Sequence, residues 1–398
     1  MKVLLVHRYF WPDTPPYASM LRTIAEHLAA EGHEVEVLTA QPSYGGSQKH
    51  DRSPRREAIG KIHVTRARLL PERPEQTVVR IANLALFGGQ VFAHILRERE
   101  LKAVMAATTP PIFIALTARI ASMISGAKFV YHMQDIYPEV MAANAGKPLA
   151  PAHRVLQKID AWTTRRADRV VVLSRDMRDT LEQRHQVTNV RLINNFLPDS
   201  SHVLEEASLG TTSWKPQSYQ VVFAGNLGNF QGLDRVIDAF KILAERNVAA
   251  HLVLLGSGAA ENELRAQAGD LLGDRIFFPG RVGQAEAETV VAASDLALVT
   301  LNPGVIRTAF PSKTMTYLSA GTPVLAAVEE TSELAQLLES ERVGSSCELD
   351  VQSIADSIES LFSSQSIASS SVVDVAESYA STSRRLPEWA NLFGELDA

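Results

Sequence analysis

The sequence contains a single cysteine, Cys347, so no disulfide can form within the chain. No cysteine and histidine residues share the spacing of a zinc site. We expect no transmembrane helix, because Pro110–Pro111 interrupts the most apolar stretch. Met1–Val6 is typical of a short buried strand and not of a signal peptide. These absences favour a globular protein of the cytoplasm.

Negative charge is scarce in the first half of the chain. Residues 1–200 hold 27 Lys/Arg and 19 Asp/Glu, a net charge of +8, whereas the remainder carries −14 and the whole chain −6. The basic half favours anionic partners such as phospholipid headgroups or a lipid diphosphate. We do not expect nucleic acid as a partner, since the basic residues are not interleaved with aromatic residues in a recognisable binding module.

Apolar runs alternate with helical patterns along all 398 residues, which predicts a doubly wound α/β protein of two domains. We expect a first Rossmann-like domain over residues 1–200, a polar linker over 201–217 and a second domain over 218–375. Residues 376–398 are predicted to form a helix that packs back toward the first domain. The serine-rich stretch Ser363–Ser371 is predicted to be a loop. Two such domains imply a cleft between the carboxyl ends of their sheets.

The segment Phe310–Val324 predicts a short helix over residues 312–320 followed by a buried strand. Pro311–Ser312 suits a helix start, because proline fits the first turn and a hydroxyl can accept from free amides. Lys313 then lies near the positive end of the helix, where an anion is already favoured. This arrangement fits a diphosphate site, although an ordinary helix with a surface lysine explains the pattern equally well.

Three more segments follow predicted strands of the second domain and should meet Lys313 at one sheet edge. Glycine-rich turns let backbone amides approach a phosphate closely, but they also occur in any tight turn between strand and helix. Arg281 and Lys313 are the basic groups best placed to pair with a diphosphate. The candidate residues of this site, which the family resemblance given next implies to be donor-binding, are Gly225, Asn226, Gly228, Gln231, Gly256, Gly258, Arg281, Val282, Pro311, Ser312, Lys313 and Thr316.

These segments, in order and spacing, resemble the donor domain of family-4 retaining glycosyltransferases. The first half is similar to the acceptor domain of that family in the segments 7–12, 28–42, 107–111 and 135–139. The resemblance covers roughly residues 1–345 and is greatest to bacterial colanic-acid and O-antigen transferases. It implies the GT-B fold, in which two Rossmann-like domains face each other across a cleft.

The chain departs from the family pattern at several positions. Asn226 and Gln231 stand where the family has a basic pair in its diphosphate turn. The two glutamates of its Glu-x7-Glu motif fall on Thr308 and Thr316. Pro15–Pro16 replace glycines of a first-domain loop near the donor phosphates, and proline has no amide proton to donate. This loop must therefore hold the donor differently.

His132 and Asp135 follow a predicted strand of the first domain and should face the cleft. In the family a histidine or aspartate here contacts the acceptor or the transferred sugar, and a carboxylate can accept a proton from a hydroxyl. For His132 a satisfied buried imidazole remains the alternative, and for Asp135 a helix cap. We count Arg281 and Lys313 with them as catalytic, and Trp11, Tyr17, Asp135 and Glu139 as acceptor-binding.

Residues 49–96 combine a basic stretch with an amphipathic helix. Lys49–Arg80 holds nine Lys/Arg against four Asp/Glu. This combination suits docking on an anionic membrane, and a solvated loop with a core-facing helix is the alternative. We therefore expect a peripheral protein on the inner face of the plasma membrane.

The resemblance implies a metal-independent retaining glycosyltransferase that needs no cofactor. Its partners would be a UDP- or GDP-sugar donor and a polyprenyl-diphosphate-linked or oligosaccharide acceptor for bacterial surface polysaccharide. A degenerate GT-B protein that binds a sugar nucleotide or a partner transferase without turnover is the alternative, supported by Thr308, Thr316 and Pro15–Pro16. A nucleotide-sugar 2-epimerase shares the architecture but lacks recognisable counterparts of its carboxylates and histidines here.

Overall fold

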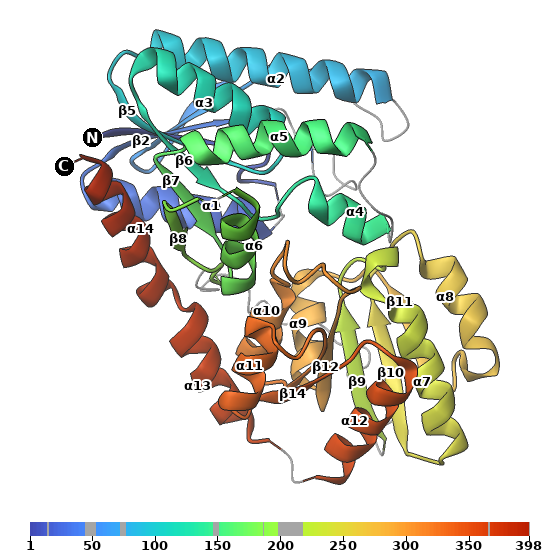
Figure 1. Cartoon of the computed structure of the whole chain (residues 1–398). Coiled ribbons are helices and arrows are strands. Elements are labelled where there is room, and N and C mark those ends of the chain that lie inside the picture. Colours follow the sequence, from blue (N-terminus) through green and yellow to red (C-terminus); the bar gives the residue numbers. More distant parts are fainter. Residues whose placement is uncertain are drawn as a thin grey trace. The chain divides into compact units, whose positions relative to one another are not determined.

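The computed structural model describes residues 1–13, 16–43, 53–71, 77–145, 151–185, 187–197, 218–364 and 367–397. The chain divides into two compact units. The first unit comprises Met1–Pro138, Leu149–Pro198 and Thr382–Ala398, and the second comprises Glu139–Pro148 and Asp199–Ser381. Figure 1 shows the elements of both units coloured along the sequence.

The first unit is built on an eight-stranded sheet in the order β3-β4-β2-β1-β5-β6-β7-β8. All neighbouring strands are parallel except β3, which pairs antiparallel with β4 through a tight hairpin. The central strands are buried on both faces, as their continuous apolar runs predict. The strands are β1 (Lys2–Val6), β2 (Glu34–Thr39), β3 (Arg56–Ile59), β4 (Ile62–Arg66), β5 (Leu101–Ala107), β6 (Lys128–His132), β7 (Arg169–Val172) and β8 (Val190–Leu192).

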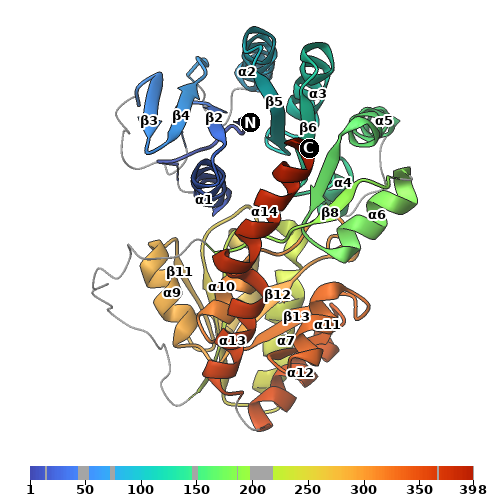
Figure 2. The same ribbon diagram turned by 90° about the vertical axis from the view of Figure 1, so that its left-hand side faces the viewer.

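Helices cover both faces of this sheet. Figure 2 shows α2, α3 and α5 together on one face, whereas α1 and α14 pack against each other on the other face. The apolar core on that second face includes Trp389 and Phe393 of α14 beside Leu21 and Ile24 of α1. The helices are α1 (Pro16–Ala30), α2 (Thr77–Arg97), α3 (Phe113–Ser125), α5 (Pro151–Arg166), α6 (Arg175–His185) and α14 (Thr382–Asp397).

The second unit is built on a six-stranded, fully parallel sheet in the order β11-β10-β9-β12-β13-β14. The register between β9 and β10 is regular, with Val221 opposite Leu252, whereas the register between β10 and β11 shifts between Val253 and Leu255. Every residue of β10 is buried. The strands are β9 (Tyr219–Ala224), β10 (Ala250–Leu255), β11 (Ile276–Gly280), β12 (Leu296–Thr300), β13 (Val324–Ala327) and β14 (Gly344–Cys347).

Two groups of helices pack on the second sheet. Helix α7 contacts α8 and α12, and α10 contacts α9 and α13. The single turn η1 (Asn229–Gln231) contacts α4, and η2 (Gly269–Leu271) follows α8. The helices are α4 (Glu139–Ala145), α7 (Leu233–Glu245), α8 (Glu261–Ala268), α9 (Gln284–Ala292), α10 (Lys313–Ser319), α11 (Glu333–Ser340), α12 (Val351–Ser363) and α13 (Ser369–Ala380).

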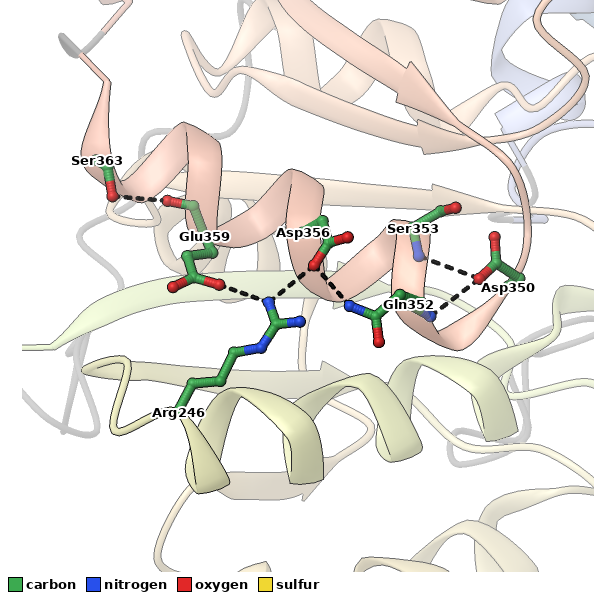
Figure 3. A network of polar contacts seen from close by, with 7 residues as sticks. All are labelled: Arg246, Asp350, Gln352, Ser353, Asp356, Glu359 and Ser363. Atoms are coloured by element: carbon green, nitrogen blue, oxygen red, sulfur yellow. Dashed lines mark hydrogen bonds and ion pairs between the residues drawn. The ribbon is translucent and has the colours of Figure 1, made fainter.

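Polar contacts fasten α7 to α12 at the edge of the second unit (Figure 3). Arg246, which follows the last residue of α7, donates to Asp356 at 2.8 Å and to Glu359 at 2.5 Å. Asp350 begins α12 as its N-cap and accepts from the amides of Gln352 and Ser353. The end of α7 is thereby held to the middle of α12.

Two domain boundaries differ from the sequence-based expectation. Glu139–Pro148 groups with the second unit, since α4 packs against η1 there. The C-terminal segment that groups with the first unit begins at Thr382 and not at residue 376. Residues 369–380 form α13, which packs on α10 in the second unit, because Ala376 and Val372 are buried there. The predicted linker over 201–217 lies outside the described residues.

Three further expectations are corrected by the structure. Helix α2 is long and apolar enough to cross a membrane by length and composition, although the sequence reading found no such segment. The expected serine-rich loop is partly helical, since Ser363 ends α12 and Ser369–Ser371 open α13. The strand β3 lies within the basic stretch Lys49–Arg80, and no strand was expected over its residues Arg56–Ile59. Two of its four residues, Arg56 and Glu57, are charged, so it lacks the apolar run that predicts a strand.

Candidate functional site

The predicted donor-binding segments of the second unit meet at the carboxyl edge of its sheet. The Gly225 amide donates to the Leu255 carbonyl at 2.9 Å, which joins the turn after β9 to the end of β10. The Gly256 amide donates to the carbonyl of Gly280, at the end of β11, at 2.8 Å. The carboxyl ends of three adjacent strands are thus linked by backbone hydrogen bonds.

Glycine is required at Gly256 and Gly258 by the close approach of these loops. A Cβ atom at Gly256, whose φ is +127°, would lie 1.9 Å from the Gly225 carbonyl oxygen. A Cβ atom at Gly258 would lie 2.3 Å from the Leu227 carbonyl oxygen. These two glycines of the predicted phosphate site therefore have a packing role between loops.

The turn after β9 presents Gly225 and Asn226 to solvent but buries Gly228 and Gln231. The side-chain oxygen of Gln231 accepts from the Gly228 amide at 3.3 Å and closes η1. Gln231 was predicted to bind the donor. Its side-chain oxygen is engaged by this contact within the turn.

Lys313 begins α10 and reaches back over β9. Its Nζ lies 3.6 Å from the centre of the Phe223 ring, and a Cβ atom built at Gly225 would lie 3.5 Å from it. The ammonium is buried and has no hydrogen-bond partner among the described residues. Burial lowers the pKa of Lys313 to about 7, because desolvation disfavours the charged form.

The start of α10 corrects one detail of the sequence-based prediction. Ser312 is the N-cap residue, but its hydroxyl accepts no amide. The amide of Thr314 instead donates to the Pro311 carbonyl, and that of Met315 to the Ser312 carbonyl. Pro311 is buried and Ser312 exposed, so the serine side chain faces solvent.

Tyr317 holds α10 against β9, a role that the sequence analysis did not assign. Its hydroxyl accepts from the Ala224 amide at 2.8 Å and donates to the Ala224 carbonyl at 3.1 Å. The ring is fully buried. The tyrosine one helical turn after Lys313 fixes the distance between that lysine and the turn after β9.

The other predicted donor residues lie at the same edge of the sheet with different exposure. Arg281 follows β11 and is exposed, and Val282 is partly exposed. Thr308 is buried and its hydroxyl donates to the Val305 carbonyl at 2.9 Å, whereas Thr316 is partly exposed. Of the two threonines, Thr316 is the one with an accessible side chain.

In the first unit, His132 ends β6 and is fully buried. Its Nδ1 lies 2.9 Å from the Tyr17 hydroxyl, and its Nε2 lies 2.8 Å from Gln134 Nε2, which is a donor. Nε2 therefore accepts, and Nδ1 carries the proton and donates to Tyr17. Burial lowers the pKa of His132 to about 3, so the imidazole is neutral at physiological pH.

Gln134 and Asn195 complete this network, and the sequence analysis missed both. The two side-chain amides exchange hydrogen bonds of 2.8 and 3.2 Å, which orient the Gln134 nitrogen toward His132. The His7 ring lies 4.5 Å from the Tyr17 ring between centroids. Since the Tyr17 oxygen accepts from His132, its own proton is available to another acceptor.

Asp135 lies three residues after β6 and is partly exposed. Burial of its carboxyl raises the pKa of Asp135 to about 6. Pro138, and not Asp135, stands immediately before the first residue of α4. The geometry therefore does not give Asp135 the N-cap position of that helix.

The remaining predicted acceptor residues come from different elements. Trp11 is 45% exposed, and the Arg22 guanidinium stacks over its ring at 5.1 Å. Glu139 is the first residue of α4 and belongs to the second unit. Pro16 opens α1, and Pro15 lies outside the described residues. Across the described part of the chain, no three His, Cys, Asp or Glu side chains gather as a metal site.

Comparison with known proteins bears on both units. Residues 17–195 match the glycosyl transferase 4-like domain and residues 218–364 match the glycosyl transferases group 1 domain. WcaI of Escherichia coli K12, named for a glycosyl transferase of colanic acid biosynthesis, is 27% identical over 85% of this chain and 86% of its own length. WbjE of Pseudomonas aeruginosa, named as a glycosyltransferase, is 27% identical over 63% of each chain.

Solved structures share the fold at lower identity. Sucrose-phosphate synthase of Thermosynechococcus elongatus has a TM-score of 0.73 at 15% identity, covering 100% of this chain and 99% of that one. HepE of Anabaena, solved with UDP, and the lipopolysaccharide glycosyltransferase WaaG each reach 0.64, at 17% and 16% identity. The match to HepE covers 99% of this chain and 99% of HepE. The match to WaaG covers 98% of this chain and 99% of WaaG. The predicted α/β class and GT-B fold are confirmed.

Proposed function

Because the chain belongs to the glycosyltransferases, with a glycosyl transferase 4-like first half and a group 1 second half, we propose that it catalyses retaining sugar transfer. The donor is a nucleoside-diphosphate sugar, and the acceptor is a lipid-linked sugar or an oligosaccharide. The product belongs to bacterial surface or extracellular polysaccharide, a setting supported by the names of WcaI and WaaG.

The observation that carries this proposal is the buried ammonium of Lys313. A cation enclosed against the Phe223 ring, with no anion beside it among the described residues, is costly unless a ligand supplies the charge. The diphosphate of the donor supplies it at the exposed turn Gly225–Asn226, and Arg281 contributes a second positive charge. Thr316 is the nearest replacement for the family's ribose-binding glutamate.

In the chemical step the bond from the anomeric carbon to the diphosphate breaks, and a bond from the same carbon to the acceptor oxygen forms on the same face. Lys313 and Arg281 stabilise the charge that develops on the leaving diphosphate, so no divalent cation or other cofactor is required. Asp135 accepts the proton of the acceptor hydroxyl, a role that its pKa of about 6 suits near neutral pH. His132 contacts the transferred sugar only as a neutral group.

The first unit brings the acceptor to the site. A polyprenyl-diphosphate-linked acceptor resides in a membrane, and the basic residues of 49–96 favour the anionic inner face of the plasma membrane. The protein therefore works in the cytoplasm as a peripheral membrane enzyme. Residues 49–52, with Arg52, and residues 72–76, with Arg73, lie outside the described part of this segment.

Calorimetry with UDP and GDP, and slow hydrolysis of UDP- and GDP-sugars, test the donor site. We expect Lys313→Ala to weaken nucleotide binding by about 1.5–3 kcal/mol, the loss of one charge-assisted contact. Lys241→Ala is the matched control, because that ammonium pairs with Asp238 at 2.7 Å on the surface. Arg281→Ala should act similarly to Lys313→Ala, and the two effects should be non-additive. Unchanged affinity in a folded Lys313→Ala protein would overturn the assignment.

One observation favours a second function, sugar-nucleotide binding without turnover. The family's two glutamates are replaced, and the Thr308 hydroxyl is already engaged with the Val305 carbonyl. A protein of this kind binds UDP or GDP but leaves every donor sugar intact. Nucleotide affinity without donor hydrolysis or transfer, in a preparation with and without EDTA, would support it over the enzyme.

A further inference from the structure

Helices α2, α3 and α5 lie side by side on one face of the first unit (Figures 1 and 2). Each of them carries large apolar side chains that are exposed. Val78 and Ile81 of α2 are 80% and 64% exposed, and Ile124 of α3 is 63% exposed. We call these three helices the α2–α3–α5 face. Its other large exposed apolar residues are Leu86, Phe113, Ile120, Met123, Val155 and Leu156.

Helix α2 is apolar around most of its circumference. Of its most apolar 18-residue window only 28% is buried. The side turned inward carries Phe87, Val91 and Ile95, and the outer side repeats apolar residues at helical spacing from Val78 to Phe92. A helix that packs only on the core of its own domain needs the inward stripe alone. The outward stripe is therefore available to contact a second apolar environment.

Hydrogen bonds hold α2 flat against its own unit. Asn83 exchanges two hydrogen bonds with the backbone of Leu70, at 2.8 and 3.0 Å. Gln90 exchanges two more with the backbone of Arg68, both at 2.9 Å. A Cβ atom at Gly88 would lie 2.5 Å from the Phe113 ring, so α2 and α3 touch closely. These contacts favour a helix that lies on a membrane over one that leaves its domain to cross it.

Charge on this face has one sign. The helices α2 and α3 contain no Asp or Glu, and α5 contains one, Asp160. That carboxylate is fully buried and accepts from the Tyr131 hydroxyl. The exposed basic residues of the three helices are Arg80, Arg97, Arg154, Lys158, Arg165 and Arg166.

We propose that the α2–α3–α5 face docks on an anionic lipid bilayer. The outward apolar residues of α2 and α3 enter the boundary between headgroups and acyl chains, and the basic residues of α5 contact lipid phosphates. A second copy of this chain is disfavoured as the occupant, because a two-fold contact would oppose two positively charged faces. The proposal deepens the membrane part of the proposed function and extends the surface beyond residues 49–96 to α3 and α5.

Sedimentation of the full-length protein with vesicles tests the charge requirement. We expect binding to vesicles of phosphatidylcholine with 30% phosphatidylglycerol, loss of binding in high salt, and little binding to phosphatidylcholine alone. Arg154→Glu with Lys158→Glu should weaken binding at least tenfold. The matched control, Lys102→Glu with Arg191→Glu, reverses two exposed charges of the first unit that lie outside both the face and residues 49–96, and it should bind as the parent does.

The apolar contribution has its own test. Since Cys347 is buried, Met123→Cys gives one accessible thiol for an environment-sensitive dye. We expect a blue shift of its emission on adding anionic vesicles, and at least tenfold weaker binding in Ile81→Gln with Ile124→Gln. Matching thermal melts show that the variants are folded.

Three results would overturn the proposal. They are absence of binding to anionic vesicles at low salt, a dye emission that vesicles leave unchanged, and a dimer in light scattering that Ile81→Gln with Ile124→Gln dissociates. Donor hydrolysis in vesicle-free solution is measured in parallel. If hydrolysis persists while vesicle binding fails, the docking surface is wrong and the proposed sugar transfer stands. If vesicle binding persists while hydrolysis fails, the docking surface stands and the proposed sugar transfer is wrong.

Discussion

At the scale of single residues, the proposed donor site contains a lysine whose charge should depend on its ligand. The ammonium of Lys313 is enclosed, and its pKa is lowered to about 7 by desolvation. An anion placed beside it raises that pKa again, because an opposite charge favours the protonated form. Binding of a diphosphate and protonation of Lys313 are therefore coupled.

We predict that UDP or GDP binding at pH 8 takes up close to one proton. The free lysine is mostly neutral at that pH and becomes charged in the complex. Calorimetry in two buffers of different ionisation enthalpy measures the uptake, and Lys313→Met should abolish it. Equal heats in both buffers for the parent protein would contradict the coupling.

The buried carboxyl of Asp135 affects the stability of the folded protein. Its pKa in the folded protein is about 6, above the ordinary value of 3.8. Between these two pH values the folded state keeps a proton that the unfolded state has lost, so stability falls as pH rises toward 6 and stays lower above it.

We predict that Asp135→Asn stabilises the protein at pH 7 by about 1–3 kcal/mol, with a smaller gain at pH 4, and reduces sugar transfer while sparing nucleotide binding. Urea unfolding at the two pH values, together with turnover, measures both effects. A variant that transfers sugar normally and is less stable at pH 7 would instead give Asp135 a structural role.

At the scale of elements, the position of α10 depends on one hydroxyl. Tyr317 bridges both backbone groups of Ala224 at the end of β9, four residues along the helix from Lys313. The helix has only seven residues, so this contact fixes much of its orientation.

We predict that Tyr317→Phe lowers the free energy of unfolding by about 1–3 kcal/mol, the cost of leaving the partly buried backbone groups of Ala224 without this partner, and raises the KM for the donor. Denaturant unfolding and donor kinetics measure the two effects. Thr316→Ala, which changes the neighbouring and partly exposed side chain, should leave stability nearly unchanged. If both variants unfold alike, the bridge does not contribute as proposed.

At the scale of the whole molecule, the C-terminus completes the first unit although the second unit precedes it in sequence. Helix α14 supplies Trp389, Leu392 and Phe393 to the core that contains β1 and α1. The stability of the first unit therefore depends on residues almost 400 positions from its start.

We predict that Trp389→Ala destabilises the first unit by about 3–5 kcal/mol, because it removes a fully buried aromatic ring. Nucleotide binding by the second unit should persist, so calorimetric unfolding should separate into two transitions. Leu386→Ala, at a partly buried position of the same helix, is the milder control. A single cooperative loss of folding and nucleotide binding would show that the two units unfold together.

The sequence by itself determined most of the elements, because strands buried on both faces have continuous apolar runs and helices have apolar stripes. The helix predicted over residues 312–320 is α10 (Lys313–Ser319), and Lys313 was recognised from local pattern. Strand β3 was missed because two of its four residues are charged and its partner is one hairpin away.

Only the tertiary structure decided what the side chains contact. Gly256 and Gly258 pack against loops that precede them in the chain, and Tyr317 holds α10 against Ala224, which is 93 positions away. Gln231 closes its own turn through a contact only three residues away, but its residue type did not give that role. The network from Tyr17 through His132 to Asn195 joins residues up to 178 positions apart by way of three different segments. Which sides of α2, α3 and α5 are exposed likewise depends on which sides pack against the sheet. A helix that is apolar on both sides does not reveal from its sequence pattern which side is buried.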